Sequence, residues 1–112
     1  MSRSLQSAAS PKSSAHLFAA LGEETRLRIV SRLCAGPMSI SQLTTGSRIT
    51  RQAITKHLRV LEGARLVHST RQGRERILQL DRRRLEDARR YLDIISKQWD
   101  STLGRLRDFV ED

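Results

Sequence analysis

The 112-residue sequence predicts a mainly α-helical domain with one small β-hairpin. Three observations indicate this fold class. Five segments carry apolar residues at helical spacing, and two of them begin with capping signals in close succession. Two strand-like runs between residues 66 and 80 flank a short loop that contains glycine. A chain of this length fits one domain, which we place at residues 15–112.

The first fourteen residues are rich in serine and poor in large apolar side chains, which predicts a disordered arm. The first helix should begin near Ser14 and end before Gly22, with Leu17 and Phe18 on its apolar face. The N-terminus lacks the apolar core of a signal peptide, and no apolar run approaches the roughly 20 residues that span a bilayer. We therefore expect a cytoplasmic protein without a membrane partner.

The second helix should run from about Glu23 to Cys34. Leu27, Val30 and Cys34 recur at helical spacing and, with Ile29 and Leu33 beside them, predict a buried stripe. Cys34 is the single cysteine, so no disulfide can form within one chain. On an apolar face a free cysteine is more often a small packing residue than a redox sensor.

Two further helices carry strong start signals. Ser39 and Gln42 form a capping box at the start of the third helix, which Gly46 ends. Thr50 then caps a longer helix that should run from Arg51 to about residue 64. Two capped helices joined by a short glycine-containing turn are typical of a helix-turn-helix.

The longer helix divides into two faces. Ile54, Leu58 and Leu61 repeat at helical spacing and should face the core. The opposite face carries side chains that can contact base edges and phosphates: Arg51, Gln52, Thr55, Lys56 and Arg59. The alternative for such a face is an ordinary solvated surface. The neighbouring segments favour nucleic acid, so we interpret residues 50–64 as a recognition helix.

The following segment predicts a hairpin, with strands at 66–71 and 74–80 around Gln72 and Gly73. A hairpin beside a helix-turn-helix is the wing of a winged helix-turn-helix, here about five helices plus a two-stranded wing. Arg71, Arg74 and Arg76 gather near its tip and can reach phosphates or a narrow minor groove. The alternative is an exposed strand edge that charge protects from pairing.

Charge is concentrated in the same part of the chain. Of the net charge of +9, the segment from Arg48 to Arg76 carries +6, since it holds eight basic and two acidic residues. Residues 81–112 carry no net charge. A basic segment of this kind indicates a polyanionic partner. We therefore add Arg48 and Thr50, at the start of the recognition helix, to the predicted DNA-binding residues.

The last helix should run from about residue 82 to 110. Its apolar residues recur at steps of three and four, close to the spacing of a coiled coil. A small domain has little core left to cover them, so we expect a second chain to do so. The predicted dimer interface consists of Leu17, Phe18, Leu92, Ile95, Trp99, Leu103, Leu106 and Val110. The alternative is packing within one chain against the first helix, and both can hold together.

The segments HLFAALGEETRLRIVSRL, ITRQAITKHLRVLEGARLV and RQGRERILQL, which lie between His16 and Leu80, resemble the ArsR/SmtB family of bacterial winged-helix repressors. The resemblance implies five helices and a β-hairpin, dimerised through the first and last helices. It implies an operator of two-fold symmetry, with the recognition helix in the major groove. It also implies a bacterial protein that is associated with the nucleoid when bound.

The sequence departs from many relatives at the metal sites of the family. The cysteine pair that many of them use falls here on Ser39 and Ser41, and the last helix contains no histidine. We therefore expect no metal site and no cofactor, as in a non-metal-sensing branch of the family, and the effector is unknown. Arg65 replaces the glycine usual before the first leucine of the wing, which predicts a different local turn.

The sequence thus predicts a homodimeric repressor that binds a pseudo-palindromic site on double-stranded DNA. A protein-interaction module or antagonist that keeps the winged-helix shape without a DNA target is the alternative. We do not expect an enzyme, because the spacings support no Ser-His-Asp, Cys-His or paired-carboxylate arrangement.

Overall fold

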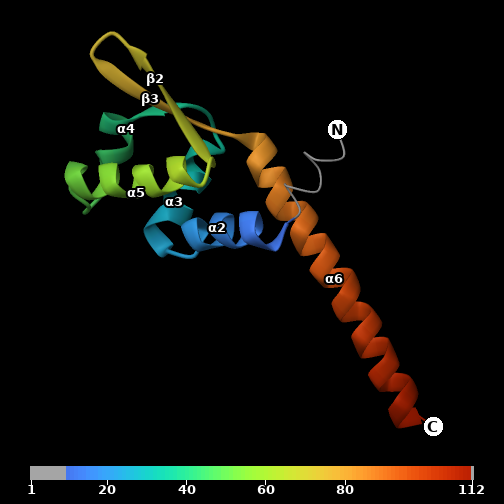
Figure 1. Ribbon diagram of the computed structural model, residues 1–112. Coiled ribbons are helices and arrows are strands. Elements are labelled where there is room, and N and C mark those ends of the chain that lie inside the picture. Colours follow the sequence, from blue (N-terminus) through green and yellow to red (C-terminus); the bar gives the residue numbers. More distant parts are fainter. Residues whose placement is uncertain (1–9, 112) are drawn as a thin grey trace.

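The computed structural model describes residues 10–111 and places a cluster of short elements at one end of a long helix (Figure 1). The helices are α2 (Pro11–Leu21), α3 (Glu24–Leu33), α4 (Ile40–Thr44), α5 (Arg51–Gly63) and α6 (Arg82–Glu111). The strands are β1 (Met38–Ser39), β2 (Val67–Gln72) and β3 (Glu75–Leu80). The predicted fold class, mainly helical with a small hairpin, is therefore confirmed.

The sheet contains the predicted hairpin and one strand that the sequence did not predict. Its order is β1-β3-β2, and both pairs are antiparallel. Strand β1 is only two residues long and pairs Met38 with Leu78 and Ser39 with Ile77. It covers the inner edge of β3, so the hairpin is held to the helices by backbone hydrogen bonds as well as by side-chain packing.

The turn of the hairpin lies one residue later than we predicted. Gln72 pairs with Glu75 in the ladder, so the two loop residues are Gly73 and Arg74 rather than Gln72 and Gly73. Gly73 has a φ of 65°, and glycine at the first loop position is the requirement of a type II′ turn. The glycine therefore fixes the register, and Arg71 comes to lie opposite Arg76.

The core joins every short element to α5. Its largest fully buried side chains come from α2, α4, α5, the α5–β2 loop and β3: Leu17, Leu43, Leu58, Leu61, Leu66 and Leu78. The predicted inward face of α5, Ile54, Leu58 and Leu61, is buried as expected. Helix α5 is thus packed along its inner side.

Helix α3 is rotated relative to our prediction. Val30 is buried as predicted, together with Ile29 and Leu33, but Leu27 is 49% exposed and Cys34 is exposed. The prediction of a buried stripe through Leu27 and Cys34 was wrong, because the buried face is centred on Ile29 and Leu33 and leaves those two on its flank.

Helix α2 begins at Pro11, earlier than the expected start near Ser14. The Ser10 side chain accepts a hydrogen bond from the Ser13 backbone N–H at 3.2 Å, and proline suits the first helical position because its missing N–H is not needed there. Residues 10–14 are therefore not part of an arm. The remainder of the predicted arm, residues 1–9, lies outside the described part of the chain.

Helix α5 ends in a Schellman motif that has arginine where glycine is usual. The Leu66 N–H donates to the Leu61 carbonyl at 3.0 Å, and the Arg65 N–H donates to the Glu62 carbonyl at 2.9 Å. Arg65 has a φ of 61°, in the left-handed region. The expectation of a different local turn was wrong: the glycine-type turn is kept, at a cost in backbone strain.

Across residues 10–111, no helix is both long enough and apolar enough to cross a membrane.

Replacing Arg65 with glycine should stabilise the protein. Relief of the left-handed strain is worth about 1–2 kcal/mol, and the greater freedom of glycine in the unfolded chain offsets part of it. We expect a net gain of about 0.5–1 kcal/mol in the free energy of unfolding, measured by urea denaturation.

Gly73→Ala is the matched control, because it places a side chain at a φ of 65° where nothing lies within 4 Å of the added carbon. It should change stability in the opposite direction. An R65G variant no more stable than the wild type would show that Arg65 is not strained in the folded chain.

Candidate nucleic-acid interface

The outer face of α5 collects the predicted DNA-binding side chains on one surface. Five residues line a single open depression there: Arg51, Gln52, Thr55, Lys56 and Arg59. Four of them are exposed, and Thr55 is half-buried with its hydroxyl donating to the Arg51 carbonyl at 2.9 Å. The face therefore presents three cations and an amide, which are the groups that bind phosphates and base edges.

The start of α5 shows that two of the predicted residues also have structural roles. The Thr50 hydroxyl accepts a hydrogen bond from the Ala53 N–H at 3.1 Å and caps the helix. The Arg51 guanidinium donates to the Ser41 hydroxyl at 3.4 Å and so connects α5 to α4. Arg48 is exposed in the loop before the helix.

The arginines of the wing divide into two kinds. Arg76 donates to the Ser69 hydroxyl at 3.0 Å and to the Glu62 carboxylate of α5 at 3.0 Å. Its guanidinium therefore joins the wing to α5. Arg71 and Arg74 are exposed, and among residues 10–111 neither forms an ion pair. The pairing of Arg76 with Glu62 also relieves the repulsion expected between Arg71 and Arg76, which lie opposite each other.

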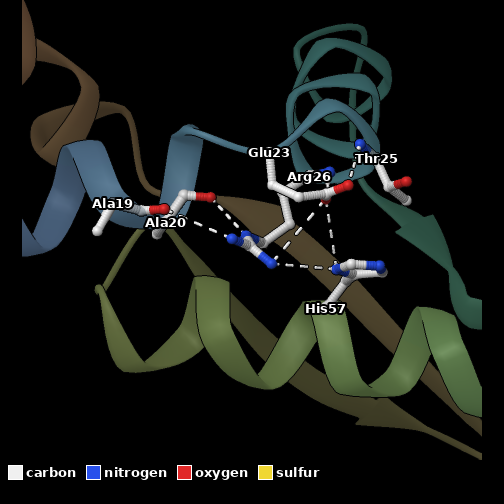
Figure 2. Close-up of polar contacts among 6 residues, drawn as sticks. All are labelled: Ala19, Ala20, Glu23, Thr25, Arg26 and His57. Carbon is white, nitrogen blue, oxygen red and sulfur yellow. Dashed lines mark hydrogen bonds and ion pairs between the residues drawn. The ribbon is translucent and has the colours of Figure 1, made fainter.

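Three side chains that sequence reasoning did not single out as a group hold the middle of α5 against α2 and α3. Figure 2 shows Arg26 between the end of α2 and His57 of α5. Arg26 donates to the Ala20 carbonyl at 2.6 Å, and its Nη1 lies 3.3 Å from Nδ1 of His57. The same His57 nitrogen is 3.6 Å from the Glu23 carboxylate. His57 is therefore a contact between helices.

Glu23 caps the start of α3. Its carboxylate accepts hydrogen bonds from the backbone N–H groups of Thr25 at 3.0 Å and Arg26 at 2.9 Å. These two bonds hold the pKa of Glu23 below its usual value of 4.5, and nearby His57 lowers it further, although partial desolvation acts in the opposite direction. The ionised form is therefore the one that stabilises the helix start.

Arg32 makes a corresponding contact at the end of α4. Its guanidinium donates to the Leu43 carbonyl at 2.9 Å and to the Gln42 carbonyl at 3.0 Å. These carbonyls lie in the last turn of a five-residue helix, where most carbonyls have no partner within the helix. Arg32 thus fixes α4, the first helix of the helix-turn-helix, to α3.

The predicted dimer residues occupy two different environments. Leu17 has no exposed surface within one chain, because it packs in the core, so its side chain cannot contact a second chain. Phe18 is half-buried, and its ring centre lies 6.1 Å from that of Tyr91. The remaining six residues, all on α6, are between 44% and 78% exposed: Leu92, Ile95, Trp99, Leu103, Leu106 and Val110.

The alternative of packing within one chain holds for the first part of α6. Helix α2 packs against α6, Leu85 packs on the core, and Ala88 is buried. Among the described residues, the C-terminal half of α6 extends away from the other elements (Figure 1), and its apolar side chains from Leu92 onward are exposed.

Comparison with known proteins agrees with this geometry. The model of the arsR family of bacterial regulatory proteins matches residues 23–69. The HTH-type transcriptional regulator Rv2034 of Mycobacterium tuberculosis is 40% identical over 74 residues, which are 66% of this chain and 69% of that protein. The solved structure of an ArsR-like transcriptional regulator from Rhodococcus sp. RHA1 is 36% identical, with a TM-score of 0.77 over 88% of this chain and 92% of that one.

The chain belongs to the ArsR family of bacterial regulatory proteins. The winged helix-turn-helix fold is also that of a domain from Mycobacterium bovis, whose solution structure is described as homodimeric and DNA-binding. That domain is 22% identical, with a TM-score of 0.63 over 89% of this chain and 90% of the other. The matched residues 23–69 of the ArsR family include the whole helix-turn-helix and the first part of the wing.

The two serines at the cysteine positions of metal-sensing ArsR relatives have other roles here. The Ser39 hydroxyl accepts the Gln42 N–H at 3.0 Å, and the Gln42 side chain accepts the Ser39 N–H at 2.8 Å, so the predicted capping box is confirmed. Ser41 accepts from Arg51. In the part of the chain that the structure describes, no three His, Cys, Asp or Glu side chains converge. That this regulator has no metal site stays a prediction.

Removing the cap of α3 should lower the stability of the protein and make that stability less dependent on pH. Glu23→Ala loses two hydrogen bonds at the helix start, so the variant should unfold at a lower temperature than the wild type at neutral pH. Because the folded pKa of Glu23 is lowered, its stabilisation is complete above the usual value of 4.5 and is lost as the pH falls through the lowered pKa.

Thermal unfolding followed by circular dichroism over a pH series measures this effect. The difference between the E23A variant and the wild type should be largest above pH 4.5 and shrink as the pH falls further. Glu24→Ala removes an exposed pair with Arg28 and a charge in the first turn but no capping hydrogen bond, so it is the control and should have a smaller effect. A difference that does not change with pH would contradict an ionised cap.

Proposed function

We propose that this ArsR-family regulator is a homodimer that binds a pseudo-palindromic site on double-stranded DNA with sequence specificity and represses transcription there. The observation that carries the proposal is the outer face of α5. Its cations and amide lie on one surface of a helix whose opposite side is fully packed. A rigid helix with a polar face of this size fits the major groove of B-DNA.

The residues of this face suit different parts of the duplex. Gln52 can form two hydrogen bonds with an adenine edge, and an arginine can do the same with guanine. Thr55 offers a methyl group to a thymine, since its hydroxyl already bonds the Arg51 carbonyl. Lys56 and Arg59 can neutralise phosphates and supply affinity for any sequence. Arg71 and Arg74 can do so from the wing, with Arg76 and Glu62 setting the angle of the wing to α5.

The exposed half of α6 supports a two-fold dimer. Six of its exposed apolar residues, those from Leu92 to Val110 that recur at steps of three and four, we call the α6 seam. An exposed apolar strip of that length on a soluble helix marks an interaction surface. In a two-fold dimer the same strip of a second copy would cover it, so that apolar side chains contact apolar side chains. The homodimeric domain from Mycobacterium bovis has the same fold. Two recognition helices in such a dimer would read half-sites about one helical turn apart, or a multiple of it.

Repression follows from occupancy, since a dimer on both half-sites covers promoter DNA that polymerase needs. The second candidate function is a winged-helix interaction module or antagonist without its own DNA target. The α5 face argues against it, because in a protein partner three adjacent cations would need acidic groups placed opposite them. Genome-wide capture of the protein on chromatin with no enriched sites would favour the second candidate.

Removing the cations of the α5 face should abolish specific binding. We expect the combined change Arg51→Ala, Lys56→Ala and Arg59→Ala to weaken binding to the native promoter by roughly 100-fold or more, since each lost contact costs about 1 kcal/mol or more. Alanine favours helix, so the fold should persist. Fluorescence anisotropy with a labelled promoter fragment measures the affinity.

A charge-matched variant provides the control for this experiment. Arg82, Arg83 and Arg90 are exposed on α6, and their replacement by alanine removes the same number of charges from a helix other than α5. This variant should bind within a few-fold of the wild type. Equal losses in both variants would mean that net charge alone attracts the DNA, and unchanged binding by the α5 variant would exclude α5 as the recognition helix.

A single carboxylate in the α6 seam should separate the dimer. Leu103→Glu would place an unpaired charge between two apolar strips, and we expect the dimer dissociation constant to rise roughly 100-fold or more. Sedimentation equilibrium measures it. Ser101→Glu is the control, because residue 101 lies about 200° around the helix from residue 103. A wild-type chain that sediments as a monomer, or a dimer unaffected by L103E, would overturn the proposed interface.

A further inference from the structure

Arg84 is a buried arginine at the start of a long and otherwise exposed helix. It is 4% exposed, whereas its neighbours Arg82 and Arg83 are exposed. A guanidinium does not lose its charge in a protein, so burying it is costly unless nearly every donor finds an acceptor. The contacts of Arg84 therefore show which groups must be held in place around it.

These contacts join three helices at one point. The Nε group donates to the carbonyl of Ala64, the C-cap of α5, at 2.9 Å. The other end of the guanidinium donates to Ser13 of α2, to its carbonyl at 2.9 Å and to its hydroxyl at 3.0 Å. Asp87, one turn along α6, lies 3.5 Å away and supplies a negative charge. Arg84 thus connects the end of the recognition helix to the start of α2 and to α6.

We propose that Arg84 is a positioning residue for DNA recognition, which sets the angle of α5 relative to α2 and α6. The proposal rests on the function proposed above, in which α6 pairs two chains and α5 reads the DNA. In such a dimer the position of each α5 on its half-site depends on how firmly α5 is fixed to α6. Arg84 is the polar link between them, and it lies at the last turn of α5, far from the residues that face DNA.

The length of α5 explains why this link affects recognition. A 13-residue helix is about 20 Å long. A tilt of about 10° around its end at Ala64 would move its beginning by roughly 3 Å, which is as long as a hydrogen bond itself. Arg51 and Gln52 lie at that beginning. A small loss of angular control at Arg84 is therefore sufficient to break base contacts, while phosphates can still be reached by long, flexible cationic side chains.

The apolar core also holds α5 in the domain. Loss of Arg84 should therefore change the angle of α5 without undocking the helix, which is what distinguishes a positioning role from a merely structural one. Ile54, Leu58 and Leu61 keep the helix docked by burial of apolar surface, which is non-directional. The Ala64 and Ser13 bonds add a directional constraint. Loss of Arg84 function should therefore reduce discrimination between DNA sequences more than it reduces affinity for DNA in general.

The experiment compares Arg84→Lys with Arg83→Lys in the full-length chain. Lysine keeps the charge but cannot donate to the Ala64 carbonyl and to both Ser13 acceptors from one rigid plane. Residue 83 is the matched control, since it is exposed on the same turn of α6. Each protein is tested for affinity to a duplex selected by the wild type from a random library and to an unrelated duplex of equal length, and circular dichroism confirms folding.

The expected result is a ratio of specific to non-specific affinity at least tenfold lower for R84K, with non-specific affinity within a few-fold of the wild type, and no change for R83K. A folded R84K with the wild-type ratio overturns the proposal. If R84K does not fold, Ser13→Ala, which removes one acceptor, decides instead: a ratio several-fold lower supports the proposal, and an unchanged ratio overturns it.

A second measurement needs no DNA and so separates this proposal from the proposed function. Relaxation dispersion of backbone amides detects motion on the microsecond-to-millisecond timescale. Residues 51–64 should show such motion in the variant that folds, R84K or S13A, and not in the wild type or R83K. If the wild type prefers no DNA sequence, the proposed function fails, while new motion in α5 still supports Arg84 as the residue that positions it. Identical dispersion in all variants overturns the positioning role.

Discussion

The last carbonyl groups of a helix have no partner within that helix, and a small helical domain must satisfy those that it buries. Here arginine side chains from other elements do so at three helix ends. Arg26 donates to the end of α2, Arg32 to the end of α4 and Arg84 to the end of α5. Each bond therefore fixes the position of one helix relative to another as well as completing its backbone. These three contacts add directional constraints to the side-chain packing that sets the angles between the helices.

This use of arginine changes how the charge of the chain should be interpreted. The net charge of +9 counts these three arginines equally with those on the surface. Arg84 is buried, and Arg26 is largely so, with a side chain 16% exposed. Arg76 is likewise directed toward Glu62. On α5 and the wing, the cations that remain free to meet a polyanion lie on the outer face of α5 and near the tip of the wing. Composition alone therefore overstates the number of cations available to DNA.

The features that sequence predicted correctly depend on neighbours within about four residues. The capping box at Ser39, the cap at Thr50 and the two faces of α5 are of this kind. The features that it missed depend on distant partners. Arg84 meets Ser13 across 71 positions, and Arg26 meets His57 across 31. The exposure of Leu27 was within reach of the sequence, since Ile29 and Leu33 recur at helical spacing and are the residues that α3 buries. The one-residue shift of the hairpin turn was predictable, since glycine is preferred at the first position of a type II′ turn.

The exposed half of α6 has a consequence for the cell in which the protein is made. If that half is covered only by a second copy, the folded population depends on the number of copies present, because dimerisation and stability are then coupled. When only a few copies are present, most chains would be monomers. Their α6 seams would then be uncovered and their α5 helices unpaired. Occupancy of a promoter would then rise with roughly the square of the protein concentration while monomers predominate. The promoter occupancy of such a regulator depends on its own expression level even when no effector is bound.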